Sequence, residues 1–214
     1  MMKLNDHNRL IKQAARTELN PIGCVQKGQS RIWLDDHNWW VGVVEFQPHS
    51  GAKGSYLNVG ACWLWHEKDS FSFDDGYRIE PFEEYLDSQQ FCEVAQSLAM
   101  KAKKEVLNLR LKYPSIHACA KHLRVQARKS DWVVFNSAVA AGLAGDLKFA
   151  EEQFSQILNQ GCRTAWQVNL QSRAAILSAV VHDADSFKLA IVDAVMKCRA
   201  LLKLPTVEPE SLFS

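Results

Sequence analysis

Two stretches decide the fold of this chain: Trp39-Trp40-Val41-Gly42-Val43-Val44-Glu45-Phe46-Gln47 and Tyr56-Leu57-Asn58-Val59-Gly60-Ala61-Cys62-Trp63-Leu64-Trp65. Side chains in both alternate with a period of two, which predicts β-strands. In the second stretch Trp63 and Trp65 share a face with aliphatic residues. We therefore expect the indole rings of this aromatic segment to form a core, rather than to stack on the bases of a nucleic acid.

The rest of the chain has mainly helical periodicity. A helix is expected over residues 5–19, and apolar residues recur at helical spacing after residue 87. We predict an α+β protein with an N-terminal helix packed on an antiparallel sheet of about four strands, followed by a C-terminal bundle of helical hairpins. The predicted domains are an α+β aromatic sheet module (residues 1–87), a helical hairpin region (88–204) and a flexible tail (205–214).

One hairpin of the helical region weakly resembles a tetratricopeptide unit. Gly145, Ala150, Phe154, Ile157 and Leu158 have the spacing of its inter-helix turn and second helix. The first-helix positions fit poorly, and the following pair of helices repeats the topology without these residues. Because a solenoid needs about three repeats to be stable, the sequence favours generic helical hairpins.

Charge and cysteine usage exclude several classes of function. The 214 residues carry 25 basic and 24 acidic side chains, a net charge of +1, so no global field attracts nucleic acid or an acidic membrane. Acidic residues gather over 67–93 and basic residues over 96–130, and the two segments could neutralise each other. The six cysteines have no metal-site spacing. We expect reduced cysteines, no metal or cofactor, no membrane span and a cytoplasmic location.

Asp35, Glu45 and Gln47 are the candidate catalytic residues. An acid near one strand end followed by E-x-Q on the next strand is similar to the metal-binding core of some nucleases, where two carboxylates hold a divalent ion that activates water. Alternation places Glu45 and Gln47 on one face. The alternative interpretation, which we favour, is that these side chains form hydrogen bonds at a strand end.

The N-terminal part, residues 4–65, resembles an uncharacterised bacterial domain-of-unknown-function family. The shared pattern is a leading helix, G-x-x-x-K-G ending at Gly28, a strand ending F-Q-x-x-S at Ser50, and Tyr-Leu-Asn-Val-Gly at residues 56–60. The resemblance implies a bacterial cytoplasmic α+β domain, and it brings no activity, cofactor or catalytic residue. Gln47, Ser50 and Asn58 are the polar residues of this motif and, with Tyr56, are the candidate ligand-binding residues.

Three functional hypotheses follow. The first is a non-enzymatic protein-interaction module that presents its helical half to a protein partner or to a second copy of itself. The second is a metal-dependent nuclease or phosphoester hydrolase that uses Asp35 and Glu45. The third is a small-ligand site at the aromatic sheet near Gln47, Ser50, Tyr56 and Asn58.

Overall fold

The computed structural model describes residues 6–126, 130–161 and 164–213, which fall into two compact units. The sheet unit contains the residues up to Cys62 together with Phe71–Leu111, and the helical unit contains Trp63–Ser70 and the chain from Lys112 onward. The sequence predicted a boundary at residue 87. In the structure most of the long helix that follows this residue belongs to the sheet unit. Cys162, Arg128 and Lys129 lie outside the described residues.

The sheet unit has the predicted α+β architecture. An antiparallel sheet in the simple order β1-β2-β3-β4-β5 follows the first helix, and a long second helix comes after the sheet. The elements are α1 (Asp6–Leu19), η1 (Asn20–Ile22), β1 (Val25–Gln26), β2 (Ile32–Asp36), β3 (Trp40–Glu45), β4 (Gly54–Trp63), β5 (Asp75–Glu84) and α2 (Ser88–Lys112).

The sheet has five strands, where the sequence predicted about four. β5 lies within the acidic segment over residues 67–93. It pairs with β4 with two irregularities of register, at Ser55/Leu57 and Leu57/Asn58. Charged side chains and Pro81 are typical of an edge strand, where they discourage further strand pairing. The charged side chains of β5 also obscure the alternation of apolar and polar residues from which a strand is predicted.

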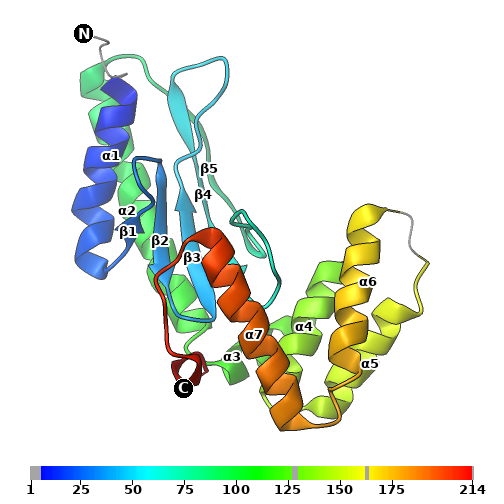
Figure 1. The fold of residues 1–214 in the computed structure, drawn as a ribbon. Helices are drawn as coiled ribbons and strands as arrows, with labels where there is room; N and C mark the ends of the chain where they lie inside the picture. The colour runs from blue at the N-terminus through cyan, green and yellow to red at the C-terminus, as the bar shows by residue number, and fades with distance from the viewer. Residues whose placement is uncertain (1–5, 127–129, 162–163, 214) are drawn as a thin grey trace. The chain divides into compact units, whose positions relative to one another are not determined.

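The two faces of the sheet follow from the register of β2 and β3. Trp33 pairs with Val44 and Asp35 with Gly42, so these side chains share one face. α1 and α2 lie side by side against this face (Figure 1), and Glu18 of α1 accepts hydrogen bonds from Gln96 and Lys103 of α2. The predicted aromatic core is confirmed: the five indoles between residues 33 and 65 are all buried, with at most 7% of each exposed.

A buried ion pair ties α2 to the sheet. Arg110 donates from Nε to Asp35 Oδ2 at 2.9 Å and from Nη2 to Asp35 Oδ1 at 2.6 Å, and His37 Nε2 lies 2.7 Å from Oδ2. Gly42 makes room for Asp35, whose Cβ would lie 3.1 Å from a Cβ at that glycine. Burial raises the pKa of Asp35, but hydrogen bonds from His37 and Arg110 outweigh it, and the net pKa lies below the ordinary value.

The helical unit is built around α4, which contacts four other helices. Its core includes Phe154 of α5, whose ring lies between Phe135 of α4 and Phe187 of α7. A Cβ at Gly142 would lie 2.5 Å from the Phe187 ring, so α4 and α7 approach closely there. The helices are α3 (Ile116–Gln126), α4 (Asp131–Leu143), α5 (Leu147–Leu158), α6 (Ala165–Ser178) and α7 (Ala184–Leu202), with η2 (Pro209–Ser211) near the end.

The segment Trp63–Ser70 packs with these helices. The Trp63 and Trp65 rings stack with centroids 5.2 Å apart, Trp63 meets the edge of Tyr113, and Trp65 Nε1 donates to Asn136 Oδ1 at 2.9 Å. Asn136 is thereby satisfied inside α4, although it is almost fully buried.

Described residues of the segment 205–213, for which the sequence predicted a flexible tail, make specific contacts. The buried Arg199 of α7 donates from Nη2 to the Pro205 carbonyl at 2.7 Å, and Leu212 is 1% exposed. The helix-ending proline gives no local signal for these contacts, because one of them depends on the Arg199 side chain of the preceding helix.

None of the described helices is both long enough and apolar enough to cross a membrane. All five described cysteines are free: Cys24, Cys62, Cys119 and Cys198 are buried, and Cys92 is exposed. Burial, followed by the charge of Asp35, raises the pKa of Cys24 to about 12, so its thiol stays protonated at neutral pH.

Substitution Arg110→Met should destabilise the protein by about 3 kcal/mol at pH 7, because it removes the guanidinium from the buried Asp35 carboxylate and leaves His37 as the remaining side-chain partner among the described residues. Chemical denaturation measures this. Lys101→Met is the matched control on α2: it removes a more exposed ion pair with Glu80, worth about 1 kcal/mol or less.

The effect of Arg110→Met should also depend on pH. The pKa of folded Asp35 is lowered, so the stability contributed by the pair is present above the unfolded pKa and is lost as the pH falls through the folded one. The gap between wild type and Arg110→Met should therefore narrow in acid. A gap independent of pH, or equal to that of Lys101→Met, would contradict the assigned pair.

Candidate functional site

The two candidate catalytic carboxylates face opposite sides of the sheet. Asp35 pairs with Gly42 on the face that α1 and α2 cover, whereas Glu45 pairs with Ile32 on the other face. Asp35 is also saturated by Arg110 and His37. The two carboxylates cannot hold one ion in this arrangement, so the structure gives no support to a hydrolase that uses both.

Three of the predicted site residues form a polar cluster that ties strands together. Asn58 Nδ2 of β4 donates to Glu45 Oε2 at 3.0 Å and to Gln47 Oε1 at 2.9 Å. Arg78 of β5 donates to Asn58 Oδ1 at 3.3 Å and to Gln47 Oε1 at 3.0 Å, and its guanidinium lies 4.0 Å from the centre of the Tyr56 ring. These side chains satisfy one another across three neighbouring segments of the sheet.

Ser50, the fourth predicted ligand-binding residue, lies apart from this cluster. It belongs to the β3–β4 loop (residues 46–53) and lines a cavity with His7, His49 and Lys53. The structure therefore separates the motif residues: Gln47, Tyr56 and Asn58 join strands, and Ser50 borders a concave surface.

A larger cavity of about 450 Å³ lies between α1 and the adjoining ends of β2 and β3. Its volume is within the usual range for a small-molecule site, roughly 300–1,000 Å³. We refer to it as the Arg31 cavity. It is lined by Asn8, Lys12, Gln29, Ser30, Arg31, Ile32, Glu45, Phe46 and Pro48.

Arg31 is the buried cation of this cavity, with 8% of the residue exposed. Its Nη1 donates to Asn8 Oδ1 at 3.0 Å, and both terminal nitrogens donate to the Gly54 carbonyl, at 3.2 and 3.1 Å. Arg31 Nε has no hydrogen-bond partner among the described residues. Burial lowers the pKa of Arg31 to about 10, and the charge of Glu45 offsets only part of that effect.

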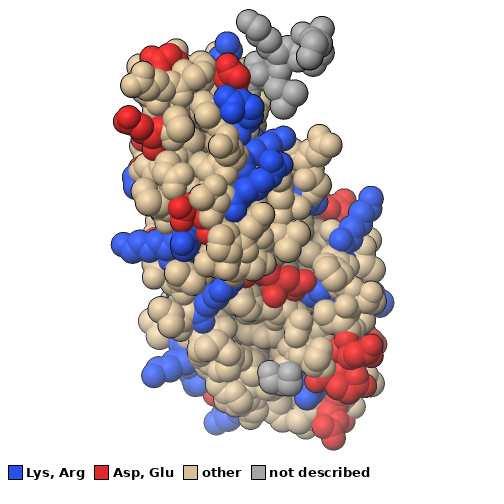
Figure 2. Space-filling model, turned by 90° about the vertical axis from the view of Figure 1, so that its left-hand side faces the viewer, with Lys and Arg blue, Asp and Glu red and all other residues tan. Residues whose placement is uncertain are grey.

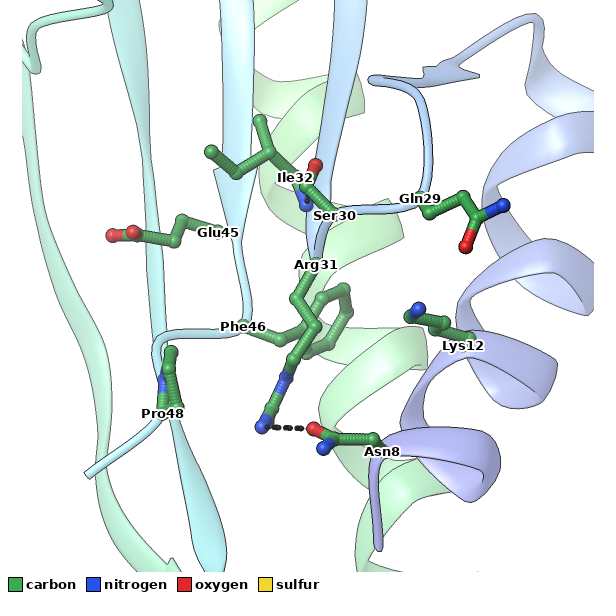
Figure 3. Close-up of a pocket in the computed structure, with 9 residues that line it drawn as sticks. All are labelled: Asn8, Lys12, Gln29, Ser30, Arg31, Ile32, Glu45, Phe46 and Pro48. Carbon is green, nitrogen blue, oxygen red and sulfur yellow. Dashed lines mark hydrogen bonds between the residues drawn. The ribbon is translucent and has the colours of Figure 1, made fainter. Parts of the chain in front are cut away.

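No carboxylate in the described part of the chain forms an ion pair with Arg31. Glu45 lines the same cavity, yet its side chain points away from Arg31 (Figure 3), and its Oε2 accepts from Asn58. The positive charge of Arg31 is thus left without an ion-pair partner among the described residues, which is unusual for a buried ion.

The neighbouring side chains add donors and further positive charge. Lys12 and Asn8 reach from α1 toward Arg31 (Figure 3). Because Asn8 Oδ1 already accepts from Arg31, its amide N–H groups are what it offers to a ligand. Figure 2 shows Lys and Arg side chains gathered on the face of the sheet unit that α1 occupies. The lining therefore favours a negatively charged guest.

The cavity of the β3–β4 loop has a volume of about 350 Å³ and shares Asn8 and Pro48 with the Arg31 cavity. His7 lines it with 6% of the residue exposed, and His7 Nδ1 has no partner among the described residues. Burial, and then the charges of Arg31 and Lys53, lower the pKa of His7. Cations that line both cavities, Arg31 in one and Lys53 in the other, thus contribute to the lowered pKa of His7.

Sequence reasoning missed Arg31, although a signal was present. Alternation in β2 places Arg31 in phase with Trp33 and Asp35, on the face that the helices cover. A cation in phase with core residues requires a partner or a function. Lys12 gave no such signal, because it lies at the border of the buried stripe of α1.

Comparisons with known proteins add no template for this site. No protein-family model matches the chain, and the searches of curated proteins and of solved structures found no match either. The resemblance of residues 4–65 to a bacterial family of unknown function stays a prediction.

Substitution Lys53→Met should raise the pKa of His7, because it removes one of the charges that lower it. NMR titration of the imidazole signals measures the shift. Lys148→Met, on α5 of the helical unit, is the control and should leave the pKa of His7 unchanged. Identical titrations of His7 in wild type and Lys53→Met would show that Lys53 does not contribute to the field of the cavity.

Proposed function

We propose that the sheet unit binds a small anionic ligand in the Arg31 cavity, so that the protein acts as a binding module. One observation carries this proposal: a guanidinium that is more than nine-tenths buried has no carboxylate partner in the described part of the chain, and it lines a cavity of small-molecule size. The proposal shares a small ligand with the third hypothesis from the sequence, but the site differs: Gln47, Ser50, Tyr56 and Asn58 do not line the Arg31 cavity.

The energetics favour an anion over a neutral guest. An isolated buried charge is costly, and an anion in the cavity would offset that cost through charge-assisted hydrogen bonds, each worth about 1.5–3 kcal/mol. Lys12 has no partner in the described part of the chain and can add a second positive charge. Phe46 and Pro48 supply an apolar wall for the uncharged part of a ligand.

The backbone holds the guanidinium in place before any ligand arrives. Gly54, whose carbonyl accepts from Arg31, has φ +153, and a Cβ there would lie 2.2 Å from the Glu83 carbonyl oxygen. Only glycine fits this position without strain, so the acceptor is fixed by the pairing of β4 with β5. Preorganisation of this kind reduces the entropy lost on binding.

Inorganic phosphate should raise the melting temperature of the wild-type protein at constant ionic strength, since a ligand that binds only the folded state stabilises it by about 2.7 kcal/mol at a hundredfold excess over Kd. Arg31→Met should weaken phosphate binding about tenfold or more, the equivalent of one charge-assisted hydrogen bond. Differential scanning fluorimetry and calorimetric titration measure both effects.

Arg16→Met is the matched control for this experiment. It removes a guanidinium from α1 that is exposed and bonds Gln26, outside the cavity. It should leave phosphate binding unchanged. If Arg31→Met and wild type respond equally to phosphate, or if chloride at equal ionic strength reproduces the whole shift, the proposed anion site is wrong.

The outer face of α6 favours a second candidate function, self-association through the helical unit. Its exposed side chains carry no charge, and Trp166, Val168 and Ile176 are 44%, 52% and 62% exposed. The one charged residue of α6, Arg173, donates to Glu67 at 2.8 Å. An uncharged face can meet its own copy without repulsion, whereas an ordinary surface helix presents charged residues to solvent.

Val168→Lys with Ile176→Lys should then abolish self-association while the free energy of unfolding of the monomer changes by less than about 0.5 kcal/mol, as expected for exposed positions. Sedimentation velocity over a range of concentrations measures the oligomeric state. Lys188→Ala, at an exposed position of α7, is the control. A wild-type protein that stays monomeric over the whole range would exclude this function.

A further inference from the structure

We infer that the ligand carries two anionic groups, one in the Arg31 cavity and one in the cavity of the β3–β4 loop. This rests on the proposed function and adds a second subsite to it. The two cavities are adjacent, because Asn8 and Pro48 border both. A molecule that fills the first and extends past Pro48 therefore enters the second.

The β3–β4 loop is held by contacts at both ends. Tyr56 N–H donates to the Gln47 carbonyl and Tyr85 N–H to the Lys53 carbonyl, each at 2.9 Å. Within the loop, the His49 ring packs against Phe82 with centroids 5.2 Å apart and against Tyr56 at 6.1 Å. These contacts place His49 at the border of the cavity.

The hydrogen bonding of His49 fixes what it can offer to a ligand. The Gly51 N–H donates to His49 Nδ1 at 2.9 Å, so a neutral imidazole carries its proton on Nε2. His49 then presents an N–H donor. The Ser50 hydroxyl can donate as well, and both residues line the cavity.

Lys53 supplies the charge of the second subsite. It is exposed, and its ammonium group has no ion-pair or hydrogen-bond partner among the described residues. The nearby His7 is more than nine-tenths buried, and its Nδ1 is unpartnered. Each cavity is thus lined by one lysine without an ion-pair partner among the described residues, Lys12 in the first and Lys53 in the second. Each is also lined by one buried side chain with an unpartnered nitrogen, Arg31 Nε in the first and His7 Nδ1 in the second. A single anionic group would satisfy only one of them.

Diphosphate and dicarboxylate compounds share this chemistry, and two pairs of probes distinguish them. Calorimetric titration compares inorganic phosphate with methylene diphosphonate, and acetate with succinate, at constant ionic strength. In at least one pair, the compound with two acidic groups should bind about tenfold or more tightly than its partner, the equivalent of one further charge-assisted contact. The pair that shows the gain identifies the class of acid.

Substitution separates the two subsites. Lys53→Met should remove most of that gain and leave binding of the single-group compound nearly unchanged, whereas Arg31→Met should weaken both compounds. Lys104→Met, an exposed lysine of α2, is the control for the loss of one positive charge and should change neither affinity.

The outcomes are distinguishable from those of the proposed function. If phosphate binding depends on Arg31 but neither compound with two acidic groups binds more tightly, or if Lys53→Met and Lys104→Met behave alike, the second subsite is wrong and the anion site stands. If no compound binds in an Arg31-dependent way, both the site and its extension are overturned.

Discussion

One guanidinium joins three parts of the sheet unit, and the placement of its long second helix depends on it. Arg110 of α2 bonds both carboxylate oxygens of Asp35 on β2 and also donates to the Ile22 carbonyl at the end of η1. A buried pair of this kind contributes little net stability over a well-packed apolar alternative, but it is costly to break. It therefore specifies where α2 lies on the sheet more than it strengthens the fold.

Arg31 and Arg110 occupy the same side of the sheet with opposite consequences. Arg110 finds a carboxylate, and its hydrogen bonds with Asp35 raise its pKa. Arg31 finds only an amide oxygen and a main-chain carbonyl, and burial lowers its pKa. The two arginines are therefore buried for different reasons. Arg110 has a structural role, and Arg31, we propose, has a role in recognition.

Alternation along single strands was enough to predict the sheet and the inward direction of the indoles, because that pattern is a property of each strand alone. The relation between Asp35 and Glu45 was not predictable in this way. The short turn between β2 and β3 pairs each odd-numbered residue of β2 with an even-numbered residue of β3. A one-residue change in that turn would reverse the faces, and register of this kind is not readable from either strand.

Other features depended on contacts distant in sequence. The assignment of α2 to the sheet unit follows from Lys101–Glu80, Lys103–Glu18 and Arg110–Asp35, none of which a local pattern reveals. The cavities likewise arise where α1 meets strand ends and a loop. The position of Arg31 in phase with core residues could be predicted from the sequence. The absence of a carboxylate partner among the described residues is apparent only from the assembled fold.

The interleaved order of the two units has a consequence for dissection of the protein. The eight residues Trp63–Ser70 leave the sheet unit, join the helices and return to it as Phe71. A proteolytic or recombinant fragment that begins near Lys112 would lack the two indoles that stack beside Tyr113 and bond Asn136. A fragment that ends near Leu111 retains every residue of the sheet unit, whereas no single truncation yields the helical half intact, because that half also needs Trp63–Ser70 from within the sequence of the sheet unit.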